Sequence, residues 1–164
     1  MAGEKIMLGV GTVTVGGTAL GMTRGGSVFT VEREFRDIVA DGDMGPVMGR
    51  KVLDREVARL TVNALELFTA ANMTKYYPAT TLTTGTTSDT YTGSLKVVSG
   101  DYADVVFTGS TLDGKDVTIT LEDAINTGNL EWTFEDKNEV VPSLEYTAHY
   151  TTNTTAPWKV VFEK

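Results

Sequence analysis

Apolar and polar residues alternate along most of this chain, and this period of two constrains the fold more than any other feature of the sequence. Successive side chains of a β-strand point to opposite faces, so an alternating segment buries one face and exposes the other. Four such segments lie in the second half of the chain, with apolar positions at Val117, Ile119 and Leu121; Leu130, Trp132 and Phe134; Leu144, Tyr146, Ala148 and Tyr150; and Trp158, Val160 and Phe162. They predict four half-buried strands with both tryptophans in the core.

Turn-forming residues separate the alternating segments. Glycine pairs and Asp-Gly or Gly-Asn steps, which favour tight turns, occur at Gly16-Gly17, Gly25-Gly26, Asp113-Gly114 and Gly128-Asn129. With 41% hydrophobic residues, the 164-residue chain is long enough to bury one core. We therefore predict a mainly β protein, an antiparallel β-sandwich or barrel, in a single domain spanning residues 1–164.

One segment, residues 63–74, departs from the period of two. Ala64, Leu67, Phe68 and Ala71 share one face at helical spacing, and Asn63 followed by Glu66 resembles an N-terminal capping box. Pro78 prevents the helix from continuing. We expect one flanking α-helix, packed against the open face or end of the β structure.

A long loop joins two strands that are rich in charge, residues 29–39 and 53–62. The loop, residues 40–51, has acids at its front and bases at its back, and it contains the following positions: Asp41, Gly42, Asp43, Met44, Gly45, Pro46, Val47, Met48, Gly49 and Arg50. Glycine gives the loop conformational freedom, and methionine adapts to irregular partner surfaces. We expect a mobile loop that takes part in self-assembly.

A second unusual segment, residues 77–93, consists largely of threonine and is almost uncharged. Such low-complexity polar segments usually form surface loops or mobile hairpins, and we favour that interpretation over a structured binding loop.

The residue inventory argues against catalysis. The chain has no cysteine and one histidine, His149, on the polar face of a predicted strand. The Asp41-Gly42-Asp43 start of a calcium loop fails because Met44 and Met48 stand where oxygen ligands are needed. The glycine-rich residues 9–17 lack the Lys-Ser/Thr ending of a phosphate loop. We expect no cofactor, no metal site and no enzymatic activity.

The net charge of −8 gives the average surface a repulsion toward nucleic acids and anionic membranes. The chain shows neither a signal peptide nor an apolar run of membrane-spanning length. We expect synthesis in a cytoplasm and no membrane partner.

The charged strands have two interpretations. In the first strand Arg33 and Asp37 share one face, while Glu32, Glu34 and Arg36 share the other. An ordinary amphipathic hairpin would present its polar face to water. Alternatively, charge of both signs on both faces would pair with another subunit, because buried charges must be paired. The residues alone leave both interpretations open.

The chain resembles a major tail protein, the tail tube subunit of a long-tailed bacteriophage of the siphophage type. The resemblance is carried in order by the strand with residues 11–17, by residues 20–26 leading into the charged strand, by Asp41-Gly42 and residues 45–50, and by residues 146–150 and 156–160, which match the usual final hairpin. Residues 77–93 are the least typical part. The type VI secretion tube protein has a similar fold.

The resemblance implies a phage tail tube fold whose copies form hexameric rings that stack into a hollow tube for DNA delivery. It implies that loop 40–51 reaches the neighbouring ring. It also implies a tape measure protein and a tail terminator as partners, and a place in the virion tail after assembly in the host cytoplasm. DNA would pass through without specific binding, and contacts that do not close on themselves generate such an open filament.

Acidic residues that line a tube would repel DNA phosphates, so we take Glu32 and Glu34 as lumen candidates. Facing a neighbouring subunit's arginine is the alternative for both. The competing class of protein is an immunoglobulin-like or carbohydrate-binding β-sandwich module, which would be equally acidic and rich in threonine. Such a module would stay monomeric and expose an aromatic platform.

Overall fold

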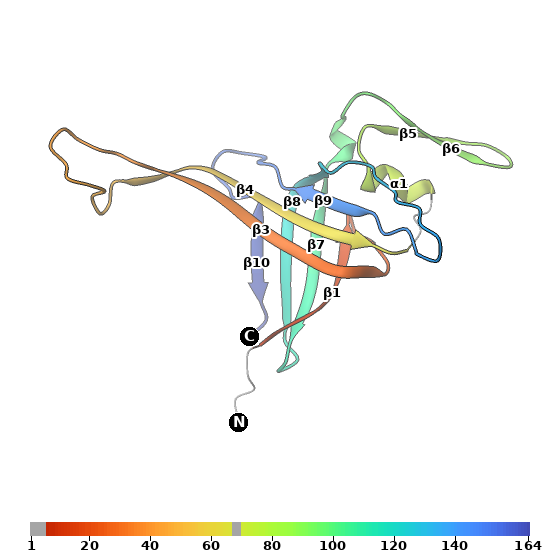
Figure 1. Ribbon diagram of the computed structural model, residues 1–164, viewed down its shortest axis with the longest axis horizontal. Helices are drawn as coiled ribbons and strands as arrows, with labels where there is room; N and C mark the ends of the chain where they lie inside the picture. Colours follow the sequence, from red (N-terminus) through yellow and green to blue (C-terminus); the bar gives the residue numbers. More distant parts are fainter. Residues whose placement is uncertain (1–5, 67–69) are drawn as a thin grey trace.

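The computed structural model describes residues 6–66 and 70–164 as a mainly antiparallel β protein with one short α-helix (Figure 1). The elements in chain order are β1 (Met7–Val15), β2 (Thr18–Ala19), β3 (Thr23–Asp37), β4 (Lys51–Ala64), α1 (Ala70–Tyr76), β5 (Thr80–Thr84), β6 (Asp89–Gly93), the 3-10 turn η1 (Ser99–Asp101), β7 (Ala103–Thr111), β8 (Asp116–Asn126), β9 (Ser143–Thr147) and β10 (Trp158–Phe162). The prediction of an antiparallel β fold with a flanking helix is confirmed.

The strands form two layers that share one strand. The order β2-β1-β7-β8-β9-β4-β3 is antiparallel throughout, and β10 pairs with β8 as well. In Figure 1, β3, β4 and β9 cross over β1, β7, β8 and β10, so that the two layers enclose the core between them. Nearly all pairing is therefore within one continuous sheet that folds over itself.

Strand β8 makes this folding possible because it passes from one layer to the other. Its first part pairs with β10, from Val117 to Leu121, and its last two residues pair with β9. The change takes place at Asp123, which has a φ of 45°, a conformation that costs a residue other than glycine some strain. The backbone N–H of Asp123 donates to the Asp104 carboxylate at 3.1 Å, which stabilises the bend.

The core lies where the predicted apolar faces meet. Val13, Val15, Leu60, Leu121 and Leu144 are almost completely buried, as are other alternating positions of β1, β4, β7, β8 and β9. Val117, Ile119, Leu144, Tyr146 and Ala148 are all buried, as their spacing predicts. Burial, together with the nearby Tyr76 and Tyr77, raises the pKa of Tyr146 far above that of a free phenol.

The helix begins later than predicted. Asn63 and Ala64 belong to β4: Asn63 pairs with Ser143, and the Ala64 N–H donates to the Pro142 carbonyl at 3.0 Å. The strand ladder thus uses backbone groups that a helix start would leave free, and Asn63 is not a cap. Glu66 does not close a capping box either, since its carboxylate accepts from the Met22 N–H at 3.1 Å. Two positions of the predicted helical face, Leu67 and Phe68, lie outside the described residues.

The helix closes one end of the sandwich. Its last turn contributes Met73 and Tyr76 to the core, and Lys75 Nζ donates to the Thr18 hydroxyl of β2 at 2.9 Å. The buried amide of Asn126 donates to the Tyr76 carbonyl at 2.7 Å. The helix therefore packs against the β2 and β8 ends of the two layers, and it ends just before Pro78.

Three other local predictions are wrong. Residues 127–142 contain no strand; Leu130, Trp132 and Phe134 are exposed, and the Trp132 indole donates to the Tyr77 hydroxyl at 3.4 Å. Gly25-Gly26 is not a turn but a bulge within β3, where both residues have positive φ. The last two strands do not form a hairpin, because β9 and β10 each pair with β8 and not with one another.

The threonine-rich segment folds as a separate two-stranded hairpin, β5–β6, which projects from the body beside α1 (Figure 1). Its face with Leu82 and Tyr91 is half-buried, whereas Thr81, Thr83, Thr90 and Thr92 are exposed. A hydrogen bond of 2.7 Å between the hydroxyls of Thr80 and Tyr91 joins the two strands at its base.

Candidate assembly surface

The β3–β4 hairpin extends beyond the body of the protein (Figure 1). The inner half of the hairpin is part of the β-sandwich. There Phe29 and Val31 of β3 pack against the core, and they lie opposite Leu60 and Ala58 of β4. Its outer half begins near the pair Arg33–Glu56, and beyond it the apolar side chains become exposed. A bulge between Glu34 and Phe35 marks the point at which the hairpin leaves the body.

Cross-strand ion pairs replace the core in the outer half. Arg36 and Asp54 are 2.9 Å apart, and Lys51 and Asp37 are also 2.9 Å apart. Each exposed pair contributes at most about 1 kcal/mol. Lys51 and Asp37 lie directly opposite each other, whereas Arg36 lies opposite Val52 and reaches Asp54 diagonally, and such cross-strand pairs favour one register over its neighbours. The mixed charge of these strands therefore pairs largely within the hairpin of the single subunit, and the choice between the two interpretations stays a prediction.

The loop at the end of the hairpin is built from two turns. The first places Gly42 at a φ of 91° and the second places Gly49 at 86°, the left-handed region that glycine adopts without strain. The Asp43 N–H donates to the Ala40 carbonyl at 3.1 Å in the first turn, and the Arg50 N–H donates to the Val47 carbonyl at 3.2 Å in the second. The positive φ of both turns thus accounts for glycine at positions 42 and 49.

One carboxylate joins the two sides of this loop. Asp43 Oδ2 accepts from the Ala40 N–H at 2.7 Å and from Arg50 Nη1 at 2.8 Å. An acidic residue from the front of the loop, Asp43, thereby forms an ion pair with a basic residue from its back, Arg50. The predicted mobility of residues 40–51 stays a prediction, and Lys51 itself belongs to β4.

The end of the hairpin exposes apolar side chains. Met44 and Met48 are fully exposed, and Ile38, Val39 and Val47 are exposed by 40% or more. We call these five residues the apolar tip. The loop residues proposed from the sequence, Asp41 to Arg50, are thus brought together here, with Gly45 and Pro46 between the two methionines. An exposed group of this kind is typical of a binding surface.

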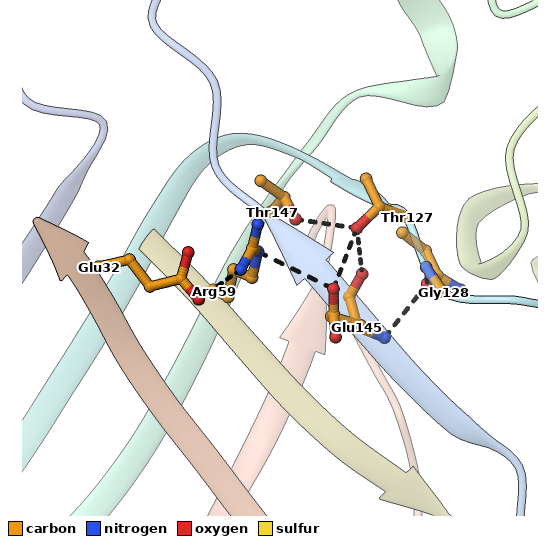
Figure 2. A network of polar contacts seen from close by, with 7 residues as sticks. Glu32, Arg59, Thr127, Gly128, Glu145 and Thr147 are labelled. Carbon is orange, nitrogen blue, oxygen red and sulfur yellow. Dashed lines mark hydrogen bonds and ion pairs between the residues drawn. The ribbon is translucent and has the colours of Figure 1, made fainter. Parts of the chain in front are cut away.

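Glu32 and Glu34 lie on the outer face of the hairpin, away from the core. Glu32 accepts from Arg59 Nη1 at 2.6 Å, and Arg59 Nε lies 3.9 Å from Glu145 Oε1, too far for a hydrogen bond (Figure 2). Glu34 lies opposite Arg55 in the register. The partner of Glu32 is therefore an arginine of its own chain, and the lumen assignment stays a prediction.

The network around Arg59 continues across β9 to the end of β8. The Thr127 and Thr147 hydroxyls are 2.9 Å apart (Figure 2). The Gly128 N–H donates to Asn126 Oδ1 at 2.9 Å. These polar contacts cover the outer face of β4 and β9 with side chains of both signs and with hydroxyls. The face is consequently hydrophilic without being uniformly acidic.

A second cluster anchors the hairpin on its inner face. Glu56 accepts from Arg33 Nε at 2.9 Å and from the Trp158 indole N–H at 2.6 Å. The ring of Trp158 lies 6.0 Å from that of Phe29, and the Arg33 guanidinium lies 5.9 Å from the Trp158 centroid. The prediction of a core position for Trp158 is confirmed, since it packs against the core. The role of Glu56 was not predicted, because its partner lies 102 residues away.

His149 lies just beyond β9, not within a strand. Its backbone N–H donates to the Glu122 carbonyl at 3.3 Å, and its ring meets Tyr102 edge-on at 5.3 Å between centroids. Among residues 6–66 and 70–164, no group of three metal-ligating side chains comes together. In the same part of the chain, no helix is long and apolar enough to cross a membrane.

Comparison with solved structures finds the same fold in a large assembly. A chain from the sheath–tube complex of an extracellular contractile injection system, the PVC system in its extended state, aligns with a TM-score of 0.57 over 99% of this chain and 93% of that chain. The two sequences are 11% identical, so the likeness shows the fold alone. The fold is thus tail-tube-like.

No family model matches the chain, and no curated protein matches it by sequence.

Proposed function

We propose that this protein is a non-enzymatic structural subunit of a phage tail tube, whose copies form hexameric rings that stack into a hollow tube. The observation that carries the proposal is the β3–β4 hairpin, which holds five exposed apolar residues beyond the body of a tail-tube-like fold. A stable soluble monomer rarely exposes such a group without a partner. Self-association would cover the tip.

The tip acts as a latch between successive rings. Removing Asp43 to Met48 deletes the Asp43–Arg50 pair and both methionines, but it leaves every strand of the body in place. We expect the shortened subunit to fold and to fail to stack. Negative-stain electron microscopy of concentrated protein should show tubes for the wild type and none for the deletion, with circular dichroism as the control for folding. Normal tubes from the deletion would refute the latch.

The tube conducts DNA past the outer face of the β3–β4 hairpin, and Glu32 and Glu34 are the proposed acidic residues of the lining. Both side chains are exposed, on an outer face that carries a hydrophilic network. Replacing both with lysine should slow DNA ejection while tubes still form; ejection at the normal rate would contradict the lumen assignment. Glu145→Lys is a useful companion, because it tests whether the effect spreads across β9.

The assembly implied by this proposal is the tail of a siphophage-type virion, built in the host cytoplasm. A tape measure protein inside the tube and a tail terminator at its end would be the partners, and DNA would pass without specific binding. The chain would use no cofactor, no metal and no membrane.

One observation favours a second function, a carbohydrate-binding module. Trp132 is 40% exposed and Phe134 is 76% exposed, on a segment that forms no strand. Exposed aromatic rings can stack on sugars. Under this alternative the wild type stays monomeric at high concentration, and Trp132→Ala abolishes binding to a glycan array.

A further inference from the structure

An apolar groove opens between the first strand and the edge strand of the other layer. It has a volume of about 590 Å³, and β1 residues 7–11 form one wall while β3 residues from Thr23 to Phe29 form the other. Leu60, Phe107 and Ile119 lie between the walls. Not one of the described residues that line it carries a charge, in a chain with 36 charged side chains, the sum of 14 basic and 22 acidic residues.

Irregular backbone keeps this groove open. The ladder between β1 and β7 shifts register between Met7 and Gly11, so residues 8–10 leave the regular pairing. A Cβ on Gly11 would lie 2.5 Å from the Phe107 ring, so only glycine lets that ring lie across β1. On the opposite wall, Gly25 and Gly26 form the bulge of β3. Both walls therefore expose backbone that no neighbouring strand covers in register.

We propose that this groove is the receptor for the apolar tip of a second copy of the chain. This inference rests on the proposed self-assembly and names the surface that the latch enters. The groove and the apolar tip are the complementary pair: the lining of the groove carries no charge and is mostly apolar side chains and glycine, and the five residues of the tip are exposed apolar side chains. Methionine fits such a site because its flexible side chain adapts to an irregular cavity.

The two surfaces lie at different ends of the hairpin. The tip is at its far end, whereas Thr23 to Phe29 of the groove wall belong to the opposite end of β3 (Figure 1). A tip therefore cannot enter its own groove, because the paired strands hold the two apart. A contact between two different surfaces of identical copies is heterologous, and repetition of such a contact builds an open filament.

The absence of cysteine in the sequence allows a direct test. Met44→Cys is mixed with Gly9→Cys under assembly conditions and oxidised, and the matched control is Met44→Cys with Gly93→Cys. Gly9 and Gly93 both have open space where a side chain would extend and neither has positive φ. We expect a cross-linked dimer with Gly9→Cys at least tenfold more abundant than with Gly93→Cys.

A second pair of variants tests the groove without a cross-link. Gly9→Glu places a charge in the groove, so burial of an apolar tip there becomes unfavourable. The concentration required for tube formation should rise about tenfold or more, a change equivalent to 1.4 kcal/mol. Gly93→Glu, with the same change of charge, should leave it unaltered. Thermal unfolding of both variants checks that the fold is intact.

The outcomes separate this inference from the function on which it rests. Tubes whose Met44→Cys cross-links to Gly9→Cys, and which Gly9→Glu prevents, would support both. Tubes that form normally with Gly9→Glu, or that cross-link no better to Gly9→Cys than to Gly93→Cys, would overturn the groove and leave the tube intact. A wild-type protein that does not assemble, together with a mixture of the Met44→Cys and Gly9→Cys variants that does not cross-link, would overturn both.

Discussion

Replacing Glu56 with alanine tests how the projecting hairpin is attached to the body. The side chain of Glu56 is 11% exposed, and its carboxylate accepts from the Trp158 indole at 2.6 Å and from Arg33 at 2.9 Å. Loss of the carboxylate leaves a partly buried indole N–H without its acceptor. A hydrogen bond to a charged group contributes ~1.5–3 kcal/mol.

The Arg33 contact contributes less. The Arg33 side chain is 46% exposed, so water can replace the carboxylate. An ion pair of this kind contributes up to ~1 kcal/mol. Together the two contacts predict that Glu56→Ala lowers the free energy of unfolding by about 1.5–4 kcal/mol. Glu56→Gln keeps an acceptor for the indole and should lose about half as much.

Urea denaturation of the unassembled subunit, followed by tryptophan fluorescence, measures these differences. A double-mutant cycle with Trp158→Phe isolates the coupling between the two side chains, because phenylalanine retains an aromatic ring and lacks the N–H. The reasoning is refuted if Glu56→Ala unfolds within about 0.5 kcal/mol of the wild type. It is equally refuted if the cycle shows that the two substitutions are additive.

Three further predictions concern the body. The buried Tyr146 phenol has a raised pKa and the unfolded phenol ionises near pH 10.0, so the unfolded state loses its proton first and stability falls above pH 10, by up to ~1.4 kcal/mol per pH unit for this group; Tyr146→Phe should flatten urea midpoints measured between pH 9 and 11, and an unchanged slope would contradict this. Gly114 has a φ of 79° in the β7–β8 turn, so Gly114→Ala should cost about 1 kcal/mol in a thermal melt, whereas Gly93→Ala, at ordinary φ, should change stability by less than about 0.5. Asn126→Asp places a carboxylate 2.7 Å from the Tyr76 carbonyl that the amide now serves, and a loss of about 3 kcal/mol or more in denaturant unfolding is expected; stability equal to the wild type would show that the amide is dispensable.

Period-two alternation predicted the fold class and most of the core correctly, since burial of one strand face is a local property of the sequence. Leu144, Tyr146 and Ala148 are buried as their spacing predicts. The same rule failed at Leu130 and Phe134, because alternation is necessary for a half-buried strand but does not supply a neighbouring strand. In the described structure no strand forms a ladder with residues 128–141.

The errors at Asn63 and at Gly25-Gly26 have another cause. Each segment has a valid local interpretation, a helix cap and a turn, and each is overridden by pairing with a distant strand. The features of the assembly surface likewise fall into those set by local sequence and those set by contacts between distant segments. The loop from Asp41 to Arg50 is local, so its glycines and its paired charges were visible in the sequence. The Glu32–Arg59 pair and the apolar groove depend on contacts between distant segments.

The length of the β3–β4 hairpin has a consequence for the dimensions of any tube. If the tip of one copy sits in the groove of the next, the hairpin acts as a ruler that fixes the distance between them. Two residues of strand span roughly 7 Å and return side chains to the same face. Adding two residues to β3 and two to β4, beyond the bulge at Glu34, would therefore lengthen the axial repeat by up to that amount while preserving every pairing. The number of residues between Glu34 and Met44 would thus determine the spacing of rings in a tube.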